Sequence, residues 1–153
     1  MSSKTAKELV QVVERVAASL SSLGPKQTQL EPAPGKWSIQ QIIGHLLDSA
    51  VNNHHRFIRA QQIDPFAFPG YEQDHWVRAQ NYNQIPWPDL LQLWMLYNRH
   101  LAHVMDAVPT EKLTVECRIG SYPTETLRFL IEDYLAHIEH HLKQIDAIRA
   151  AFE

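Results

Sequence analysis

Four long segments of this sequence have the hydrophobic periodicity of an α-helix, and prolines separate them. The prolines gather at 25–34, 65–69 and 86–88, with single prolines at positions 109 and 123. Proline interrupts helices and the segments between these breaks contain almost no glycine, so the breaks mark helix ends. Helices that each carry one apolar stripe bury those stripes most simply against one another. We therefore predict an all-α fold, a four-helix bundle, with residues 1–153 forming one domain.

The first two segments carry ordinary helix signals. The first covers about residues 4–23, ends at Gly24-Pro25, and has an apolar stripe at steps of four and three: Leu9, Val13, Val16, Leu20 and Leu23. The second begins at Ser38, which is followed three residues later by Gln41 in a capping-box pattern. Beside its apolar stripe, four polar residues fall on one flank at 100° per residue: His45, Ser49, Asn52 and Arg56. A polar strip next to a core face is unusual and requires a reason.

The third and fourth segments complete the bundle. The third follows Pro88-Asp89, with the stripe Leu90, Leu93, Trp94, Tyr97, Leu101, Val104 and Val108. The fourth covers about 124–151 and is the most regular: Leu127, Ile131, Tyr134, Ile138, His141, Ile145, Ile148 and Phe152. In the connections we expect a short extra helix within Tyr71–Tyr82 or a small extended excursion at Thr114–Tyr122.

Histidines on the second and fourth segments are the strongest functional signal. His141 replaces an apolar residue in the core stripe of the fourth segment, and His137 lies one turn earlier on the same side. An unpartnered buried imidazole costs on the order of 1–3 kcal/mol, so this pair requires a partner from another helix. His45 on the polar strip supplies one. Three neutral imidazoles from two facing helices are typical of a metal site in a bundle core, and we predict one divalent ion there.

The remaining histidines and the single cysteine form no comparable set. His140 projects toward the edge of its helix, and His100 fits an ordinary hydrogen bond between helices. Cys117 lies in a connection without the spaced histidine that a cysteine nucleophile needs. For the histidines of the predicted site, the structural alternative is a set of hydrogen-bonded core side chains.

Charge and cysteine content narrow the class of protein. The formal net charge is −3 and no Lys/Arg cluster is present, so nucleic-acid binding is not expected. The N-terminus lacks the apolar core of a signal peptide, and no apolar run approaches the length of a membrane span. One cysteine cannot form an internal disulfide, which fits a reducing compartment. We expect a cytoplasmic protein without a membrane partner.

Several motifs resemble those of the DinB-like superfamily, and within it the branch of YfiT-like metal-dependent hydrolases and bacillithiol S-transferases. The motifs, in order, are Gly35-Lys36-Trp37-Ser38, His45-Leu46-Leu47-Asp48-Ser49, Asn52, Arg56-Phe57, Tyr71-Glu72, Trp76 and His137-x-x-x-His141. They cover roughly residues 30–146. The resemblance implies a DinB-type bundle, a three-histidine site at His45, His137 and His141, zinc or nickel as the ion, and a homodimer.

Three neutral ligands leave a coordination position open, where the ion lowers the pKa of a bound water or thiol. Two reactions follow: transfer of a low-molecular-weight thiol to a small electrophile, or hydrolysis of an ester or amide. The thiol reaction is favoured by the resemblance and by the lack of a carboxylate clearly placed on the inward faces beside the histidines, because Asp48 projects away from the apolar stripe. A non-catalytic bundle that binds a metal or ligand is the third hypothesis.

Residues around the predicted ion are candidates for contact with a small-molecule substrate. Asn52, Arg56, Tyr71 and Trp76 are the candidates for substrate binding, with Arg56 able to form a bidentate pair with a carboxylate. An interhelix salt bridge is the structural alternative for Arg56, and loop packing is the alternative for Tyr71 and Trp76. Glu72 and Arg56 are the candidates for a direct catalytic role, and no general base is assigned.

Overall fold

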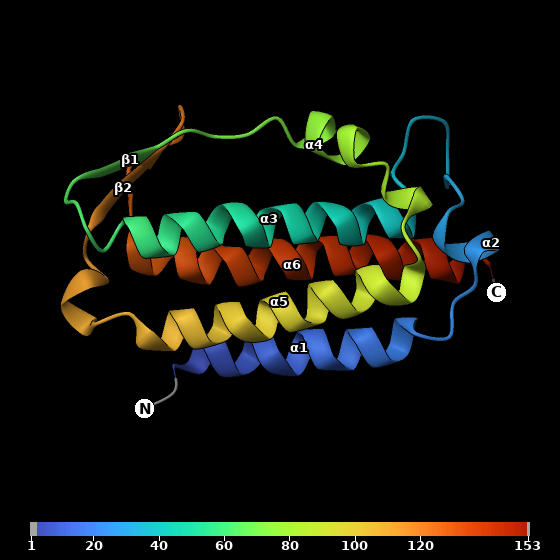
Figure 1. Cartoon of the computed structure of the whole chain (residues 1–153), viewed down its shortest axis with the longest axis horizontal. Helices are drawn as coiled ribbons and strands as arrows, with labels where there is room; N and C mark the ends of the chain where they lie inside the picture. The colour runs from blue at the N-terminus through green and yellow to red at the C-terminus, as the bar shows by residue number, and fades with distance from the viewer. Residues whose placement is uncertain (1–2, 153) are drawn as a thin grey trace.

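A computed structural model describes residues 3–152 and confirms the four-helix bundle. Its four long helices are α1 (Lys4–Leu20), α3 (Ile39–Arg59), α5 (Trp87–Ala107) and α6 (Leu127–Ala150). Helices α1 and α3 both pack against α5 and α6, so they lie on one diagonal of the bundle. Helices α3 and α5 run in one direction and α1 and α6 in the other (Figure 1). The chain must therefore return along the length of the bundle between α3 and α5.

Short elements fill that crossover and the other connections. They are α2 (Pro25–Thr28), β1 (Phe66–Phe68), α4 (Gln73–Gln80), η1 (Tyr82–Gln84), η2 (Thr110–Lys112), β2 (Glu116–Ile119) and β3 (Glu125–Thr126). Helix α4 confirms the extra helix predicted within 71–82, and β2 confirms the extended excursion at 114–122. Strands β1 and β3 were not predicted, because three- and two-residue strands show no periodicity of their own. The sheet order is β1-β2-β3.

The sheet joins the crossover to the start of α6 at one end of the bundle (Figure 1). Strand β1 is parallel to β2, with Phe66 opposite Cys117, and β3 is antiparallel to β2, with Glu116 opposite Thr126. The predicted start of the fourth helix at 124 is therefore wrong, because residues 125–126 are a strand. Helix α6 begins at Leu127, where the Thr126 hydroxyl accepts a hydrogen bond from the backbone N–H of Phe129 at 3.1 Å.

The start of α3 has the predicted capping box. The Ser38 hydroxyl accepts a hydrogen bond from the backbone N–H of Gln41 at 3.2 Å, and the Gln41 side-chain oxygen accepts one from the Ser38 N–H at 3.0 Å. These bonds satisfy N–H groups that the first helical turn leaves without partners. The cap fixes where the helix begins and so sets which face of α3, including His45, points into the bundle.

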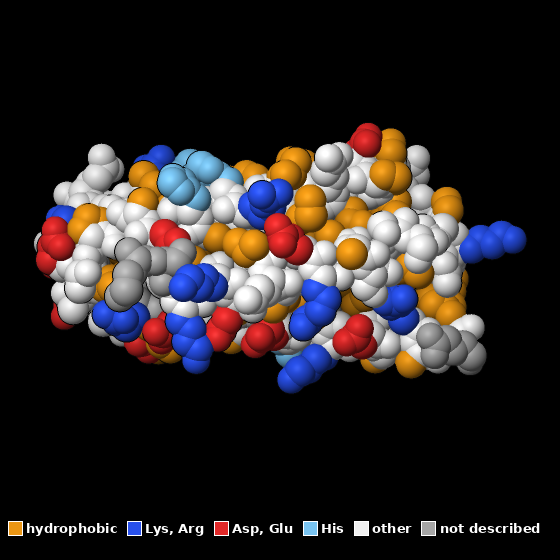
Figure 2. All heavy atoms as spheres, turned by 90° about the horizontal axis from the view of Figure 1, so that it is seen from below, with side chains coloured by type: hydrophobic (Ala, Val, Ile, Leu, Met, Phe, Trp, Pro, Cys, Tyr) orange, Lys and Arg blue, Asp and Glu red, His pale blue; other side chains and the backbone are white. Residues whose placement is uncertain are grey.

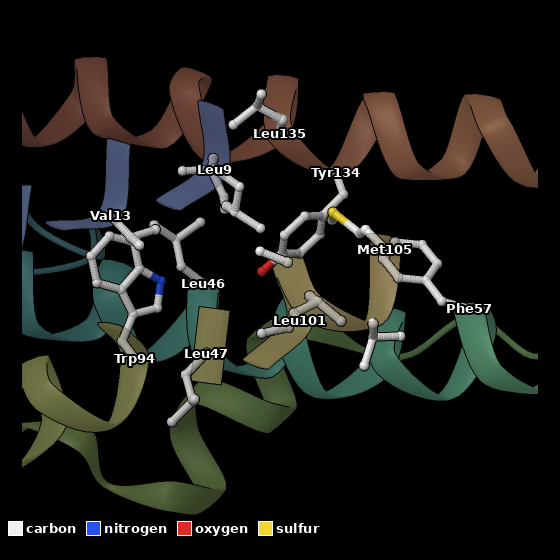
Figure 3. Packing of buried hydrophobic residues seen from close by; sticks show 14 of the residues in the cluster. Leu9, Val13, Leu46, Leu47, Phe57, Trp94, Leu101, Met105, Tyr134 and Leu135 are labelled. Carbon is white, nitrogen blue, oxygen red and sulfur yellow. The ribbon is translucent and has the colours of Figure 1, made fainter. Parts of the chain in front are cut away.

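Side chains from all four long helices meet in one core (Figure 3). Leu9 of α1, Leu46 of α3 and Trp94 of α5 are fully buried. Two predicted core positions are wrong: Leu93 is 51% exposed, with Leu91 buried in its place, and Phe152 is 37% exposed. A polar contact crosses the core where the Tyr134 hydroxyl of α6 donates a hydrogen bond to the side-chain oxygen of Asn98 on α5. This bond satisfies two polar groups that the apolar core would otherwise leave unpaired.

A buried tyrosine of the crossover, Tyr82, packs against α3. The Tyr82 ring lies against Gly44, and a Cβ at that glycine would stand 2.1 Å from Tyr82 Cδ2. The Tyr82 hydroxyl donates a hydrogen bond to Asp48 Oδ1 at 2.5 Å, and Gln80 Nε2 donates to the same oxygen at 2.8 Å. Asp48 is 2% exposed, and its Oδ2 has no hydrogen-bond partner within residues 3–152. Asp48 thus makes a buried contact with the crossover.

Because the Asp48 carboxyl group is buried, we predict that the difference in stability between wild type and an Asp48→Asn variant depends on pH. Burial raises the pKa of Asp48 above its ordinary 3.8, although the hydrogen bonds from Tyr82 and Gln80 oppose the shift. A raised folded-state pKa favours the folded wild type below about pH 3.8, and this advantage is lost as the pH rises through the folded-state pKa. We therefore expect Asp48→Asn to be the more stable protein at pH 7, with a margin that shrinks toward pH 4.

Urea unfolding of the two proteins at pH 7 and pH 4 measures that margin. The asparagine side chain keeps an oxygen for Tyr82, so the comparison isolates the buried charge. The histidines titrate in both proteins and cancel in the difference. If the stability advantage of Asp48→Asn instead increases as the pH falls, the hydrogen bonds that lower the pKa of Asp48 outweigh the burial that raises it.

The surface of α1 and α5 carries mixed charge, with Lys and Arg side chains interspersed among Asp and Glu (Figure 2). In the part of the chain that the structure describes, no helix is long and apolar enough to cross a membrane.

Candidate metal centre and adjoining cavities

The structure brings His45, His137 and His141 together between the antiparallel helices α3 and α6. His137 Nε2 lies 3.3 Å from His45 Nε2 and 3.1 Å from His141 Nε2. One ring nitrogen from each of the three lies within 4.8 Å of the other two. His45 is fully buried, His141 is 9% exposed, and His137 is half-buried. Residues 92 positions apart in the chain thus converge because the two helices pack side by side.

These distances fit a shared metal ion. Zinc–imidazole bonds of about 2.0–2.1 Å at tetrahedral angles place neighbouring nitrogens about 3.3 Å apart. The two measured nitrogen–nitrogen distances, 3.1 and 3.3 Å, match that spacing. Hydrogen bonds alone account for the cluster less well, because a neutral His137 has at most one proton on Nε2 and so can donate to only one of its two neighbours.

The three rings are neutral at physiological pH. Burial lowers the pKa of His45 to about 3, and charge on His141 and His137 contributes less. Burial likewise lowers the pKa of His137 to about 4 and lowers that of His141. Neutral imidazole is the form that binds metal. Their environment therefore keeps all three side chains in the ligand form without the metal's own charge.

Two neighbouring side chains orient these rings. The Nδ1–H of His141 donates a hydrogen bond to the side-chain oxygen of Gln144 at 2.8 Å, which leaves the Nε2 lone pair free to face the other histidines. The Trp37 ring lies over His45 with centroids 4.7 Å apart. His45 Nδ1 is buried and has no hydrogen-bond partner within residues 3–152. This burial costs about 1–3 kcal/mol, which a metal bond at Nε2 would offset.

One side of the histidine cluster opens into a cavity of about 450 Å³. His137 is part of its wall, so a molecule in the cavity can contact this member of the cluster. The walls come from α3, α6, the start of the crossover and the β2–β3 end of the sheet: Ser49, Asn53, Arg56, Gly70, Tyr71, Gln73, Cys117, Ile119, Tyr122, Pro123, Glu125, Phe129, Leu130, Asp133 and Tyr134. Its size is within the range of small-molecule sites.

A second groove of about 470 Å³ has none of the three histidines in its wall. Its walls include Trp37, which packs on His45, and Gln144, which holds His141. The other walls are mainly apolar, with Lys36 and Asp74 as the charged side chains: Pro32, Gly35, Ile42, Ala147 and Ile148. The cavity with His137 in its wall therefore touches the cluster directly, whereas this groove touches it only through Trp37 and Gln144.

The candidate substrate-binding residues divide into two groups. Arg56 and Tyr71 line the cavity, and the guanidinium carbon of Arg56 lies 5.9 Å from the centre of the Tyr71 ring. Asn52 does not: its amide donates to the backbone oxygen of Asp48 at 2.9 Å, within its own helix. Trp76 packs behind Tyr71, with ring centroids 5.5 Å apart, and Glu72 is an exposed N-cap of α4. Neither Trp76 nor Glu72 belongs to the cavity wall.

Three cavity residues were missed. Asn53, one position after Asn52, faces the cavity because the space lies toward the Ser49 side of the polar strip. Asp133 lies one turn before His137, and helical spacing alone would have placed it on the same face. Glu125 reaches the cavity from β3, and no sequence signal marks that approach. The expectation that no carboxylate lies near the histidines is therefore wrong for the cavity beside them.

The remaining candidates, Cys117, His140 and His100, lie outside the histidine cluster. Cys117 is buried in β2, and burial, with a smaller effect from Asp64, raises the pKa of its thiol to about 11, which disfavours a nucleophilic role. His140 is exposed. The predicted interhelix hydrogen bond at His100 is wrong, because His54 makes it instead, with Nδ1 2.8 Å from the Tyr97 hydroxyl, while His100 is exposed.

Fold and site together define a helical-bundle protein with a three-histidine centre suited to one divalent ion. The sequence matches the DinB superfamily over residues 8–145, and the chain belongs to that superfamily. This confirms the resemblance found in the motifs.

Two proteins with similar sequences and one with a similar structure are found. A "Putative metal-dependent hydrolase" from Geobacillus thermodenitrificans (strain NG80-2) is 23% identical over 137 residues, covering 89% of this chain and 77% of the relative. A protein with the same description from Bacillus mycoides (strain KBAB4) is 23% identical over 148 residues, covering 95% of this chain and 84% of the relative. The structure of YfiT from Bacillus subtilis, described as "a probable metal-dependent hydrolase with an unusual four-helix bundle topology", superposes with a TM-score of 0.83 at 19% identity, over 99% of this chain and 90% of that one.

Proposed function

We propose that this chain is a metal-dependent enzyme that transfers a low-molecular-weight thiol to a small electrophile, with zinc or nickel held by His45, His137 and His141. The single observation that carries the proposal is the cluster of three histidines with His137 in the wall of a cavity of about 450 Å³. A transferase must place two organic reactants next to one centre, whereas a hydrolase needs room for one and a water. A cavity of this size is large enough for a small thiol and a small electrophile together.

The chain's own residues bring the reactants together. His45, His137 and His141 would hold the divalent ion, which when bound would favour the deprotonated form of a thiol. The thiol proton passes to solvent, the sulfur lone pair forms the carbon–sulfur bond, and the leaving group departs with its bonding electrons. His137 marks the end of the cavity where the sulfur must lie, and Tyr122, Phe129 and Tyr134 provide apolar and aromatic contacts for an organic reactant.

A conjugation assay tests the transfer. Metal-loaded protein is mixed with cysteine as the thiol and chlorodinitrobenzene as the electrophile, and product is followed by absorbance. We expect a rate at least about tenfold above the uncatalysed reaction. We expect the rate to fall to background in His45→Ala and to persist in His140→Ala, because His140 is exposed. Equal rates with and without protein, across a panel of small thiols and electrophiles, would contradict the transferase.

Hydrolysis of an ester or amide is the second candidate, and one observation favours it. Asp133 and Glu125 line the same cavity as His137, so a carboxylate is available as a general base for water. The descriptions of the two relatives agree with this reaction. Hydrolysis predicts turnover of nitrophenyl esters without added thiol and loss of that turnover in Asp133→Asn or Glu125→Gln. A bundle that binds a metal or ligand without catalysis predicts neither activity.

Three further features belong to the same proposal. The substrate is a small molecule, because the cavity of about 450 Å³ holds no larger partner. The protein acts in the cytoplasm, in keeping with its single cysteine. It works as a homodimer, which size-exclusion chromatography with light scattering would detect as a mass of twice the 17.7 kDa chain.

A further inference from the structure

Arg56, a cationic side chain in the cavity wall, has no anionic partner within residues 3–152. Arg56 is half-buried on α3 and lines the cavity that also contains His137. The ion pairs within residues 3–152 join Lys4 to Glu8 and Arg99 to Glu14, so the guanidinium has no carboxylate partner there. Its Nε–H is buried and donates to no hydrogen-bond acceptor among the same residues. The salt bridge that was the structural alternative for Arg56 is therefore absent from this part of the chain.

A buried guanidinium without an anion is costly. Burial lowers the pKa of Arg56, and nearby Tyr71 and Tyr122 only partly oppose the shift. The Tyr71 ring lies within cation–π range of the guanidinium, but an aromatic face does not satisfy its N–H donors. A planar group with two oxygens does, through two parallel charge-assisted hydrogen bonds. The N–H groups of Arg56 can thus donate two parallel hydrogen bonds to a molecule in the cavity.

The remaining charges in the wall favour a singly charged anion. Glu125 and Asp133 line the same cavity and form no ion pair with Arg56. Two carboxylates against one guanidinium disfavour a dianion such as phosphate, because each added negative charge is repelled by both. A carboxylate carries one charge and matches the planar geometry of the arginine.

We infer that the cavity binds a carboxylate-bearing reactant, with its carboxylate on Arg56 and its reacting end toward His137. The inference rests on the proposed function only in taking this cavity as the reactant site. Asn53 and Ser49, on the same face of α3, also line the cavity, and the Asn53 amide donates a hydrogen bond to the backbone oxygen of Ser49 at 2.8 Å. Phe129 and Tyr122 are 42% and 72% exposed and provide apolar surface at the mouth of the cavity for the body of the reactant. Arg56 is a binding residue in this arrangement and has no part in bond making.

Calorimetric titration of the metal-loaded protein tests this inference without an activity assay. The probes are benzoate, benzamide as its neutral counterpart, and inorganic phosphate. We expect benzoate to bind best of the three and Arg56→Gln to weaken it about 10- to 100-fold, the loss typical of a hydrogen bond to a charged group. Arg56→Lys should retain part of the affinity. Arg59→Gln is the matched control, because Arg59 lies on the same helix, is exposed and contacts Phe68 outside the cavity.

Two outcomes would overturn the inference. Benzoate that binds Arg56→Gln as tightly as wild type but fails to bind His45→Ala would be held by the ion, not by the arginine. Phosphate that binds better than benzoate, and loses affinity in Arg56→Gln, would assign a different anion. Elemental analysis of Arg56→Gln shows whether a change in benzoate binding results from loss of the metal. We expect the variant to contain as much metal as wild type. The benzoate–benzamide comparison in wild type needs no variant, and equal affinities would also contradict the carboxylate.

Discussion

His45→Ala is expected to reduce the bound divalent metal from one ion per chain to less than about a tenth of that after dialysis. His45 contributes one of the three Nε2 atoms and is the fully buried member of the set. Outer residues that only orient a ligand change metal affinity by about 10- to 100-fold, so loss of a ligand should exceed that range. Elemental analysis of the purified protein measures the effect. Excess zinc or nickel should raise the melting temperature of wild type and leave that of the variant unchanged.

His140→Ala is the matched control for the metal. It removes the same side chain from the same helix, one residue from a proposed ligand, at an exposed position. Its metal content should equal that of wild type. Circular dichroism of His45→Ala distinguishes loss of the ion from loss of the fold. Metal that stays at one ion per chain in the folded His45→Ala variant, or a wild type that binds none when titrated, would refute the three-histidine centre.

Gly44→Ala is expected to destabilise the protein by about 3 kcal/mol, at the upper end of the cost of overpacking. The new Cβ would stand 2.1 Å from Tyr82 Cδ2, and that ring cannot withdraw easily because its hydroxyl is bonded to Asp48. For a domain of this size the loss corresponds to a melting temperature lower by about 6–12 °C. Thermal and urea unfolding followed by circular dichroism measure it. Gly70→Ala is the control, because nothing lies within 4 Å of the point that its new Cβ would occupy.

A second variant shows whether the contact with Tyr82 is the cause. In a Tyr82→Ala background the ring is gone, and alanine has a higher helix propensity than glycine by about 1 kcal/mol. Gly44→Ala should then be neutral or stabilising, so the effect changes sign between backgrounds. The same loss of stability in both backgrounds would show that the glycine is required for another reason.

The sequence predicted the long helices and the residues that meet at the ion because both depend on helical spacing. The stripes of α1, α3 and α6 follow steps of three and four, and His137 and His141 follow the same rule. The rule is less reliable at the edge of a stripe, where one position decides burial. For this reason Leu93 was predicted to be in the core and Asn52 to line the site. Leu91 is buried in the core instead of Leu93, and Asn53 lines the cavity instead of Asn52.

Contacts that depend on the crossover, or on the connection between α5 and α6, were beyond prediction. Glu125 reaches the cavity through β3, and Tyr82 reaches Gly44 after the chain has turned back over α3. Such contacts join short elements whose paths depend on packing, not on the periodicity of their own residues. Gln144 is the exception, because it lies three residues after His141 and could have been identified as its partner from helical spacing.

The three histidines and the outer wall of the cavity belong to different parts of the chain. The proposed ligands are fixed on α3 and α6, whereas Tyr71, Ile119 and Tyr122 come from the crossover and the strand connections. Loops tolerate substitution and changes of length far better than packed helices do. Substitutions in the outer wall can therefore reshape the cavity while the helices that carry the three histidines stay unchanged. The fold thus separates the residues that shape the cavity from those that form the histidine cluster.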